Sequence, residues 1–334
     1  MLKKIIKTNE FFVAMILIVL CLFIGILNPV FFTLQNLFDL CRSATVMGIF
    51  AMGALIVIIS GGVDVSFTAI AISAMYITVK ILLALNFTGT VVVAIALSAL
   101  IGLIMGLINA AIIAFFKIPT LIATLGTQSL FQGFLLFFIG SKYINNVPDG
   151  MLRFARTNLV TTTTSSGAIT GLQAGILILI GVAIIVWFIL RFTMIGRGIY
   201  AIGGSREAAE RAGFNVVAIQ FFIYGLVGIL AGIGGAVFGS HYKQANPFDL
   251  VGTELNTIAA VVLGGALITG GKGTVFGAIL GVSLVVVINN SLVLIGVPSE
   301  WQKVVLGIIL IIGAGIPAYK NMMAEKRLKA NLSE

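Results

Sequence analysis

The chain has 334 residues, of which 60% are hydrophobic and only 9% are charged, and its mean hydropathy is +1.18. A water-soluble protein of this size does not bury so large an apolar fraction, so the composition excludes the soluble classes and predicts a protein solvated by a lipid bilayer. The formal net charge is +9. Because the basic residues lie at the two tails and between apolar segments, they indicate membrane topology rather than nucleic-acid binding. The single histidine, His241, excludes sites that need paired histidines, and Cys21 and Cys41 are predicted to be buried free thiols.

Ten apolar segments are predicted to span the membrane, since a hydrocarbon core of about 30 Å needs about 20 residues of helix. In chain order they are residues 11–28, 44–60, 66–85, 89–116, 120–140, 169–190, 215–240, 254–270, 274–296 and 302–319. The segments 44–60 and 254–270 are short and adjoin glycine pairs, a pattern that accompanies substrate paths or close backbone packing. Glycines four residues apart predict close helix packing at 102/106, 228/232, 235/239 and 273/277/281. We therefore predict an all-α polytopic bundle of about ten helices.

The N-terminal sequence combines three lysines with an apolar run, which resembles a signal peptide. The run Phe11–Asn28 is too long for the apolar core of a typical signal peptide, and no small-residue cleavage motif follows it. We therefore expect an uncleaved first span.

Ten spans place both tails on one side of the membrane, and the distribution of Lys and Arg selects that side. If the tails are cytoplasmic, thirteen basic residues lie inside: Lys3, Lys4, Lys7, Lys117, Arg191, Arg197, Arg206, Arg211, Lys272, Lys320, Lys326, Arg327 and Lys329. Six lie outside: Arg42, Lys142, Arg153, Arg156, Lys243 and Lys303. Lys80, at a span end, is assigned to neither side. The excess of basic residues predicts that both termini are cytoplasmic.

Two connectors between spans carry further information. The outer segment 141–168 contains the Thr/Ser tract Thr161–Ser166 and is expected to be a flexible surface loop. The inner segment 191–214 is predicted to hold a short helix with Ser205 as its N-cap and Gly213 as its C-terminal stop. A simple connector helix with a solvated charged face needs neither this length nor small residues, which favour docking into a groove of another protein. Its small helix-forming residues are Ala208, Ala209 and Ala212.

The sequence offers no motif for nucleotide binding or catalysis. The segment Gly270–Thr274 resembles a P-loop, but Gly273 follows the lysine where Ser or Thr is required, and Ala266 replaces the first glycine. No carboxylate pair, Ser/His/Asp set or Cys/His cluster lies in one stretch of sequence. We therefore expect no chemistry of hydrolysis or acyl transfer in this chain.

Asp64 is the one carboxylate that adjoins a span break without a nearby cation. It has two interpretations, an ionisable residue on a transport path or, with Ser66, a cap on the following helix. The cap is favoured, because the position is expected near the cytoplasmic face. The amides inside spans, which either join helices or line a polar path, are Asn109, Gln128, Gln132, Asn256, Asn289 and Asn290. Uncharged groups of this kind suit a neutral polyol better than an ion.

Four ordered motifs resemble the permease subunits of ABC importers for ribose and related simple sugars, the branched-chain-type permease family. They are Ser60–Ser66 (SGGVDVS), Ile118–Thr127 (IPTLIATLGT), the segment Gly196–Gly213 and the segment Val262–Gly277, and Asn289–Gln302 fits as well. The resemblance covers nearly the whole chain. The chain departs from the family at Asp64–Ala69, where DVSFTA replaces the usual DLSVGS and adds bulk to that turn.

The resemblance implies a permease subunit of an ATP-driven importer that moves a neutral simple sugar across the cytoplasmic (inner) membrane. It implies a second permease subunit, identical or related, two cytoplasmic ABC ATPase subunits and an extracytoplasmic sugar-binding protein. ATP and Mg²⁺ would be used by the ATPase, with no cofactor or metal in this chain. The implied fold is that of the cobalamin importers (type II), with ten helices per subunit in one transmembrane domain, residues 1–334.

The resemblance also assigns roles to residues. It places a coupling helix in 191–214, with Ala208 and Ala209 against a groove of the ATPase and glycines at the turns; the residues concerned are Gly203, Gly204, Ser205, Ala208, Ala209 and Gly213. The translocation path is expected to include Asp64, Ser66, Thr127, Gln128, Asn256, Asn289 and Asn290.

Two other functions are weighed against this one. An ion-coupled secondary sugar carrier needs carboxylates near the middle of the membrane, whereas the sequence offers only Asp64, near an edge. A carrier also leaves the helix in 191–214 without a role. An intramembrane enzyme lacks its catalytic set.

Overall fold

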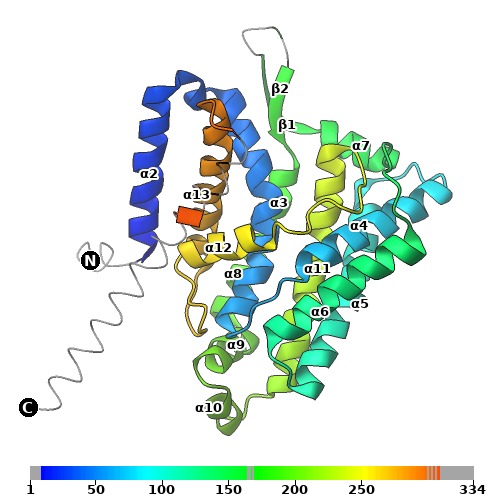
Figure 1. Cartoon of the computed structure of the whole chain (residues 1–334), viewed down its shortest axis with the longest axis vertical. Coiled ribbons are helices and arrows are strands. Elements are labelled where there is room, and N and C mark those ends of the chain that lie inside the picture. Colours follow the sequence, from blue (N-terminus) through cyan, green and yellow to red (C-terminus); the bar gives the residue numbers. More distant parts are fainter. Residues whose placement is uncertain are drawn as a thin grey trace, which may run out of the picture.

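The computed structural model describes residues 9–163, 167, 169–298, 301, 304, 307 and 308, and most of these residues are helical (Figure 1). Within this part of the chain, eight helices are long and apolar enough to cross a membrane. They are α2 (Asn9–Leu27), α3 (Leu34–Ile59), α4 (Phe67–Ala84), α5 (Val91–Phe116), α6 (Thr120–Phe134) with its π-helical continuation η2 (Leu135–Ile139), α8 (Gly175–Phe192), α11 (Val216–Tyr242) and α13 (Val275–Leu294). The chain is therefore a polytopic helical membrane protein, as the composition predicts.

The ten predicted spans correspond to these helices with four differences. The first residues of the predicted span 169–190 form the strand β2 (Ile169–Gln173), and the helix α8 begins only at Gly175. The helix α3 begins at Leu34, well before residue 44, because Thr33 caps it with a hydrogen bond from Asn36 N (3.3 Å). The predicted span 254–270 is α12 (Glu254–Leu263), whose ten residues are too short to cross a bilayer. The predicted span 302–319 lies almost wholly outside the described residues. The ten-helix, type II arrangement therefore stays a prediction.

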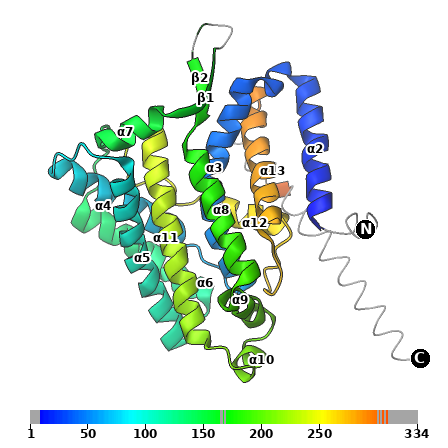
Figure 2. The same cartoon turned by 180° about the vertical axis from the view of Figure 1, so that it is seen from behind.

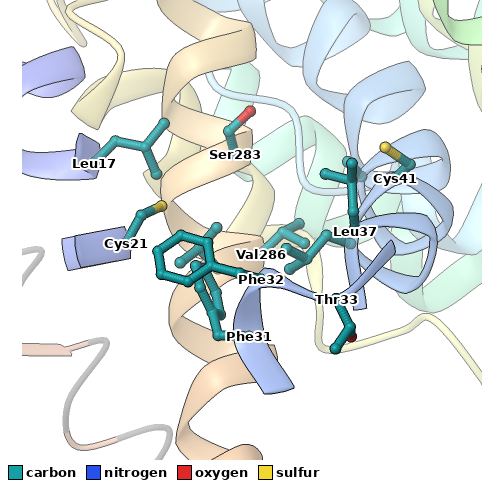
Figure 3. A pocket seen from close by; sticks show the side chains of 12 residues that line it. Leu17, Cys21, Phe31, Phe32, Thr33, Leu37, Cys41, Ser283 and Val286 are labelled. Atoms are coloured by element: carbon teal, nitrogen blue, oxygen red, sulfur yellow. The ribbon is translucent and has the colours of Figure 1, made fainter. Parts of the chain in front are cut away.

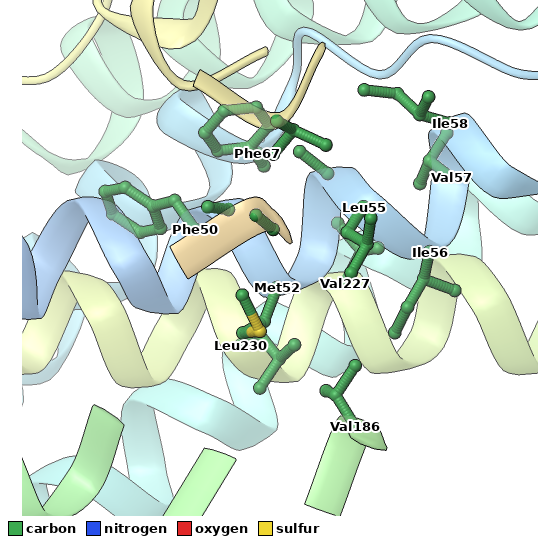
Figure 4. Packing of buried hydrophobic residues seen from close by; sticks show 14 of the residues in the cluster. Phe50, Met52, Leu55, Ile56, Val57, Ile58, Phe67, Val186, Val227 and Leu230 are labelled. Atoms are coloured by element: carbon green, nitrogen blue, oxygen red, sulfur yellow. The ribbon is translucent and has the colours of Figure 1, made fainter. Parts of the chain in front are cut away.

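Helix α3 forms the centre of the bundle and α2 its edge. In the most apolar window of α3, 78% of the residues are buried, against 17% in α2, so α3 contacts protein on most sides whereas α2 is exposed along most of its surface. Figure 4 shows side chains of α3 packed between α8, α11 and the start of α4. These include Phe50, Met52, Leu55 and Ile56 of α3, Val186 of α8, Val227 and Leu230 of α11, and Phe67 of α4.

Helices α5 and α11 pack with their backbones in contact. A Cβ built on Gly102 or Gly106 would overlap backbone carbonyl oxygens of α11, and one built on Gly228 would overlap the carbonyl of Gly102. The approach also lets Ser98 Oγ donate a hydrogen bond to Gly232 O (2.7 Å). The close packing that the glycine spacing predicts is confirmed here.

The connector 141–168 has more structure than predicted. It contains α7 (Asp149–Arg156) and β1 (Asn158–Thr163), and β1 pairs antiparallel with β2 (Ile169–Gln173) in a short hairpin. The expectation of a flexible loop is therefore wrong for the described part of this connector, which excludes residues 164–166 and 168. The reason is burial: Val147 and Met151 lie in an apolar cluster at the end of α4, a contact that the local polar composition does not reveal. Figure 2 shows the hairpin and α7 at one end of the bundle, with α9 (Met194–Gly204) and α10 (Arg206–Arg211) at the other.

Candidate functional site

Two helices, α4 and α12, begin inside the bundle rather than at its ends (Figure 1). Residues 60–66 lead from the end of α3 back into the bundle before α4 starts. At 1.5 Å per residue, α12 is about 15 Å long, which is half of a hydrocarbon core. The two starts meet, because Thr68 Oγ1 donates a hydrogen bond to Glu254 Oε2 (3.0 Å). Interrupted helices at this depth need protein partners for their free backbone groups, and they place polar groups where a solute can pass.

Asp64 lies just before α4 and holds Ser66, the N-cap residue of that helix. Its Oδ1 accepts hydrogen bonds from Ser66 N and from Ser66 Oγ, both at 2.7 Å, and Ser66 Oγ accepts one from Asn109 Nδ2 (2.7 Å). The cap interpretation is met only in part: Ser66 is the N-cap residue of α4 but its side chain makes no capping bond, and Asp64 holds Ser66 instead. Asp64 is only 2% exposed and lies among buried residues of α4, α5 and α6, and its expected place near the cytoplasmic face stays a prediction. Among the described residues, Asp64 Oδ2 and Asn109 Oδ1 have no hydrogen-bond partner.

Threonines of α6 satisfy the backbone of the interrupted segment. Thr120 Oγ1 accepts a hydrogen bond from Val63 N (3.0 Å), and Thr124 Oγ1 accepts one from Val65 N (3.3 Å). These two N–H groups belong to no helix and are shielded from water, so hydroxyls one helical turn apart on α6 replace the missing backbone partners. The motif Ile118–Thr127 thus has a structural role beside Asp64.

Glu254, the first residue of α12, is the second carboxylate of the site, and the sequence interpretation missed it. It is 8% exposed. Its Oε2 accepts hydrogen bonds from Thr68 Oγ1 (3.0 Å) and Gly252 N (2.8 Å), and its Oε1 accepts one from Gln128 Nε2 (3.1 Å). The expectation that only Asp64 was available is therefore wrong. Glu254 is the first residue of a predicted span that is short and adjoins a glycine pair, and this pattern was the available signal for a site. Its position at the start of the span suggested a place at the membrane edge, so it was not included.

These residues form what we call the polar cluster: Asp64, Ser66, Thr68, Asn109, Gln128 and Glu254. Three of the predicted path residues, Asp64, Ser66 and Gln128, are in it. Thr127 is buried beside it and donates a hydrogen bond to Thr124 O (3.3 Å), while Asn256 is half-buried on α12. Asn289 and Asn290 lie on α13, and no hydrogen bond of the described residues joins them to the cluster. The described salt bridges are both in α10, so no described Lys or Arg forms one with Asp64 or Glu254.

The segment 191–214 contains the predicted short helix. Ser205 caps α10, since its Oγ accepts a hydrogen bond from Ala208 N (3.3 Å), and Gly213 ends it with a φ of +86°. Both predictions are confirmed. The charges on α10 pair along the helix as Arg206 with Glu210 (3.2 Å) and Arg211 with Glu207 (3.8 Å). Figures 1 and 2 show α10 as the outermost element at its end of the bundle.

The two alanines of α10 lie on different faces of the helix. Ala208 is exposed, whereas Ala209 is only 2% exposed and belongs to the chain's own core. The expectation that both lie against a partner is therefore corrected for Ala209, because neighbouring residues of a helix do not share a face.

The two glycines before α10 also differ from their expected role at turns. Both lie in the last turn of α9, and neither has a positive φ. A Cβ on Gly203 would overlap Ile59 O, whereas one on Gly204 would meet nothing within 4 Å. Nearby, Tyr200 Oη donates a hydrogen bond to Gly273 O (2.7 Å), and burial raises the pKa of this phenol.

A separate cavity of about 390 Å³ lies between α2, η1 (Pro29–Phe32), α3 and α13 (Figure 3). Its walls are almost entirely apolar, with Phe31, Phe32 and Leu37 among them. Cys21 and Cys41 line it as free, half-buried thiols. Its lining lacks the convergent polar groups that a polyol needs.

The bundle, the interrupted helices and the polar cluster define a membrane permease rather than an enzyme. The chain belongs to the family described as branched-chain amino acid transport system / permease component, which matches residues 36–314. It is 31% identical over 302 residues to the ribose import permease protein RbsC of Haemophilus influenzae, covering 89% of each chain. It is 34% identical over 299 residues to RbsC of Bacillus subtilis, covering 89% of this chain and 88% of the relative.

A second group of relatives carries a different substrate. The chain is 33% identical over 310 residues to the autoinducer 2 import system permease protein LsrC of Photorhabdus luminescens, covering 92% of this chain and 89% of the relative. No solved structure matches the chain. The resemblance to permeases of simple-sugar importers is confirmed.

Proposed function

We propose that this chain is the membrane-spanning subunit of an ATP-driven importer and that it carries a neutral polyhydroxylated solute, a pentose or hexose or a related small polyol. The observation that carries the proposal is the polar cluster where α4 and α12 begin. Hydroxyls and amides both donate and accept hydrogen bonds, and carboxylates accept them, so the cluster offers both kinds of partner that sugar hydroxyls require. The names of the relatives, ribose and autoinducer 2 import permeases, support this substrate class.

The cluster argues against an amino acid, although the family's description includes branched-chain amino acids. The carboxylate of an amino acid needs a cation or a free helix N-terminus. No described Lys or Arg pairs with the cluster, and the starts of α4 and α12 already carry Asp64 and Glu254. An incoming carboxylate would therefore meet negative charge.

The ion-coupled carrier is the weaker alternative, but the number of carboxylates, on which the sequence argument relied, is no longer the reason. Glu254 adds a second buried carboxylate, so the number of acidic groups no longer separates the two functions. The family and α9–α10 now separate them, because a carrier that uses an ion gradient needs no exposed cytoplasmic helix for a partner. The relatives are import-system permeases.

The proposal includes an orientation and a set of partners. Both termini and α10 lie on the cytoplasmic side of the inner membrane, where α10 contacts an ABC ATPase that uses ATP and Mg²⁺. The opposite end, with α7 and the β1–β2 hairpin, receives an extracytoplasmic sugar-binding protein. A second permease subunit, identical or related, completes the assembly. The whole chain acts as one permease domain, with 191–214 as its coupling segment.

Reconstitution of the complex tests the proposal. The chain is purified from membranes with its ATPase and binding-protein partners, placed in liposomes, and assayed for uptake of radiolabelled ribose in competition with other sugars and with leucine. We expect uptake of at least one neutral sugar. This uptake should require ATP on the side of the liposome membrane to which the ATPase faces, and leucine should not compete with it. Uptake of leucine without competition by any sugar would refute the substrate class, and uptake driven by an ion gradient without ATP would refute the mechanism.

A further inference from the structure

Three segments that are far apart in the sequence meet backbone to backbone beneath the polar cluster. We call this contact the glycine junction, and it consists of Gly61, Gly203, Gly270 and Gly271. Gly61 follows α3, Gly203 lies in the last turn of α9, and Gly270 and Gly271 lie in the turn between α12 and α13. Each segment thus contributes at least one glycine to the contact.

The contacts at the junction leave no room for a side chain at Gly203 or Gly270, while Gly61 and Gly271 have a positive φ that disfavours other residues. Gly271 N donates a hydrogen bond to Ile59 O (2.8 Å), the last carbonyl of α3. A Cβ on Gly203 would overlap Ile59 O and lie 2.5 Å from Gly271 N. A Cβ on Gly270 would lie 2.6 Å from Gly203 O and 2.8 Å from Gly61 Cα, and the φ of +92° at Gly270 is itself unfavourable for other residues. Close-packed backbones of this kind transmit a displacement instead of absorbing it.

Both halves of the polar cluster are connected to this junction by short stretches of chain. Asp64 lies three residues beyond Gly61, and its hydrogen bonds to Ser66 hold the start of α4. The other stretch is α12, which begins at Glu254 and ends at Leu263, and the connector that follows it reaches Gly270 seven residues later. Tyr200 of α9 adds a tie to the same connector through its hydrogen bond to Gly273 O (2.7 Å).

We propose that the glycine junction is the positioning element through which a movement of α9–α10 reaches the polar cluster. A shift of α9 displaces the segments on both sides of Gly203, and those segments hold the carboxylates of Asp64 and Glu254. The relation between the starts of α4 and α12 then changes with the position of α10. The inference rests on the proposed function of α10 as the contact with an ATPase, and it adds the residues that carry the movement inward.

The test compares Gly203→Ala with Gly181→Ala in the complete complex. Gly181 lies on α8, and a Cβ there meets nothing within 4 Å, so the control makes the same change without overlap. Both variants are made in a chain with Cys21 and Cys41 replaced by serine and a bimane fluorophore on Leu255→Cys, an exposed position of α12. The readouts are co-purification with the ATPase, basal ATP hydrolysis and the ATP-induced change in bimane fluorescence, none of which requires the sugar to be known.

We expect ATP to change the fluorescence in the parent and in Gly181→Ala. In Gly203→Ala we expect the change to fall at least fivefold, while ATPase binding and basal hydrolysis persist because the exposed face of α10 is intact. An equal fluorescence change in Gly203→Ala and Gly181→Ala would overturn the inference. If ATP changes nothing even in the parent, it is the proposed ATP-driven function that fails.

A milder variant decides the case if Gly203→Ala does not assemble. Tyr200→Phe removes only the hydroxyl that donates to Gly273 O, so the fold of α9 is retained. We expect normal assembly and at least a twofold smaller fluorescence change. The opposite result is a Tyr200→Phe complex whose ATP-induced fluorescence change is undiminished, together with a Gly203→Ala chain that only misfolds. That result would show that the junction is structural and does not transmit movement.

Discussion

Thr68 and Glu254, 186 positions apart in the sequence, are joined by a hydrogen bond of 3.0 Å at the point where α4 and α12 begin. Glu254 also accepts from Gln128 of α6, so one carboxylate connects three helices. A buried carboxylate without a cation depends on such donors, because each lost donor leaves part of its charge unsolvated. The hydrogen bonds of Glu254 are therefore a structural requirement of the same polar cluster that we propose a sugar contacts.

The first prediction concerns Thr68. Thr68→Val keeps the shape of the side chain and removes one donor to Glu254, and hydrogen bonds to charged groups contribute about 1.5–3 kcal/mol. We expect a lower thermal stability in detergent and a several-fold loss of uptake.

Thr78→Val is the matched control, because Thr78 is also buried on α4 but its hydroxyl has no hydrogen-bond partner among the described residues. We expect this variant to be as stable as the parent or slightly more stable. Equal effects of the two substitutions would show that the contact with Glu254 contributes nothing.

The second prediction separates the hydrogen bonds of Asp64 from its charge. Asp64→Asn keeps an oxygen that accepts from Ser66, so we expect near-normal abundance and at least half of the uptake. Asp64→Leu leaves the two donors of Ser66 without their acceptor, and a buried polar group without a partner costs about 1–3 kcal/mol. We expect it to lower abundance and thermal stability clearly. Complete loss of uptake in a stable Asp64→Asn protein would instead support ion coupling through this carboxylate.

The third prediction uses the different faces of α10 on which Ala208 and Ala209 lie. Ala208→Arg adds a large side chain on the exposed face, so we expect normal abundance in the membrane and at least a tenfold loss of ATPase co-purification. Ala209→Arg places a long cation in the core, where overpacking alone costs about 1–3 kcal/mol, so we expect the chain itself to be lost. Normal co-purification in Ala208→Arg would move the ATPase contact to another surface.

The fourth prediction concerns topology. Single cysteines at Ser205, before α10, and at Thr163, in β1, lie at opposite ends of the bundle. Each new cysteine is introduced into a chain whose own cysteines have been replaced. In intact cells, we expect a membrane-impermeant maleimide to label only the cysteine at position 163. Labelling at both positions from outside would refute the proposed orientation.

Much of the fold could be predicted from the sequence, because the signals are local. Long apolar runs identify eight of the membrane helices, and Ser205 and Gly213 delimit α10 by cap chemistry that depends only on neighbouring residues. The glycine spacing on α5 and α11 predicts their close contact for the same reason. The hairpin at 158–173 and the burial of Ala209 could not be predicted, since each depends on what packs against the segment.

By itself, the sequence determined that the chain is a polytopic membrane protein of a sugar-permease type and that a short helix lies between α8 and α11. Hydropathy, caps and motifs are properties of consecutive residues, and the bilayer imposes the rest. Only the tertiary structure decided that Glu254 joins Thr68 and Gln128, that Asp64 is buried, and that Gly203 contacts Ile59. These relationships depend on where the two helices α4 and α12 begin within the bundle, and that position is set by packing between segments as much as 186 residues apart.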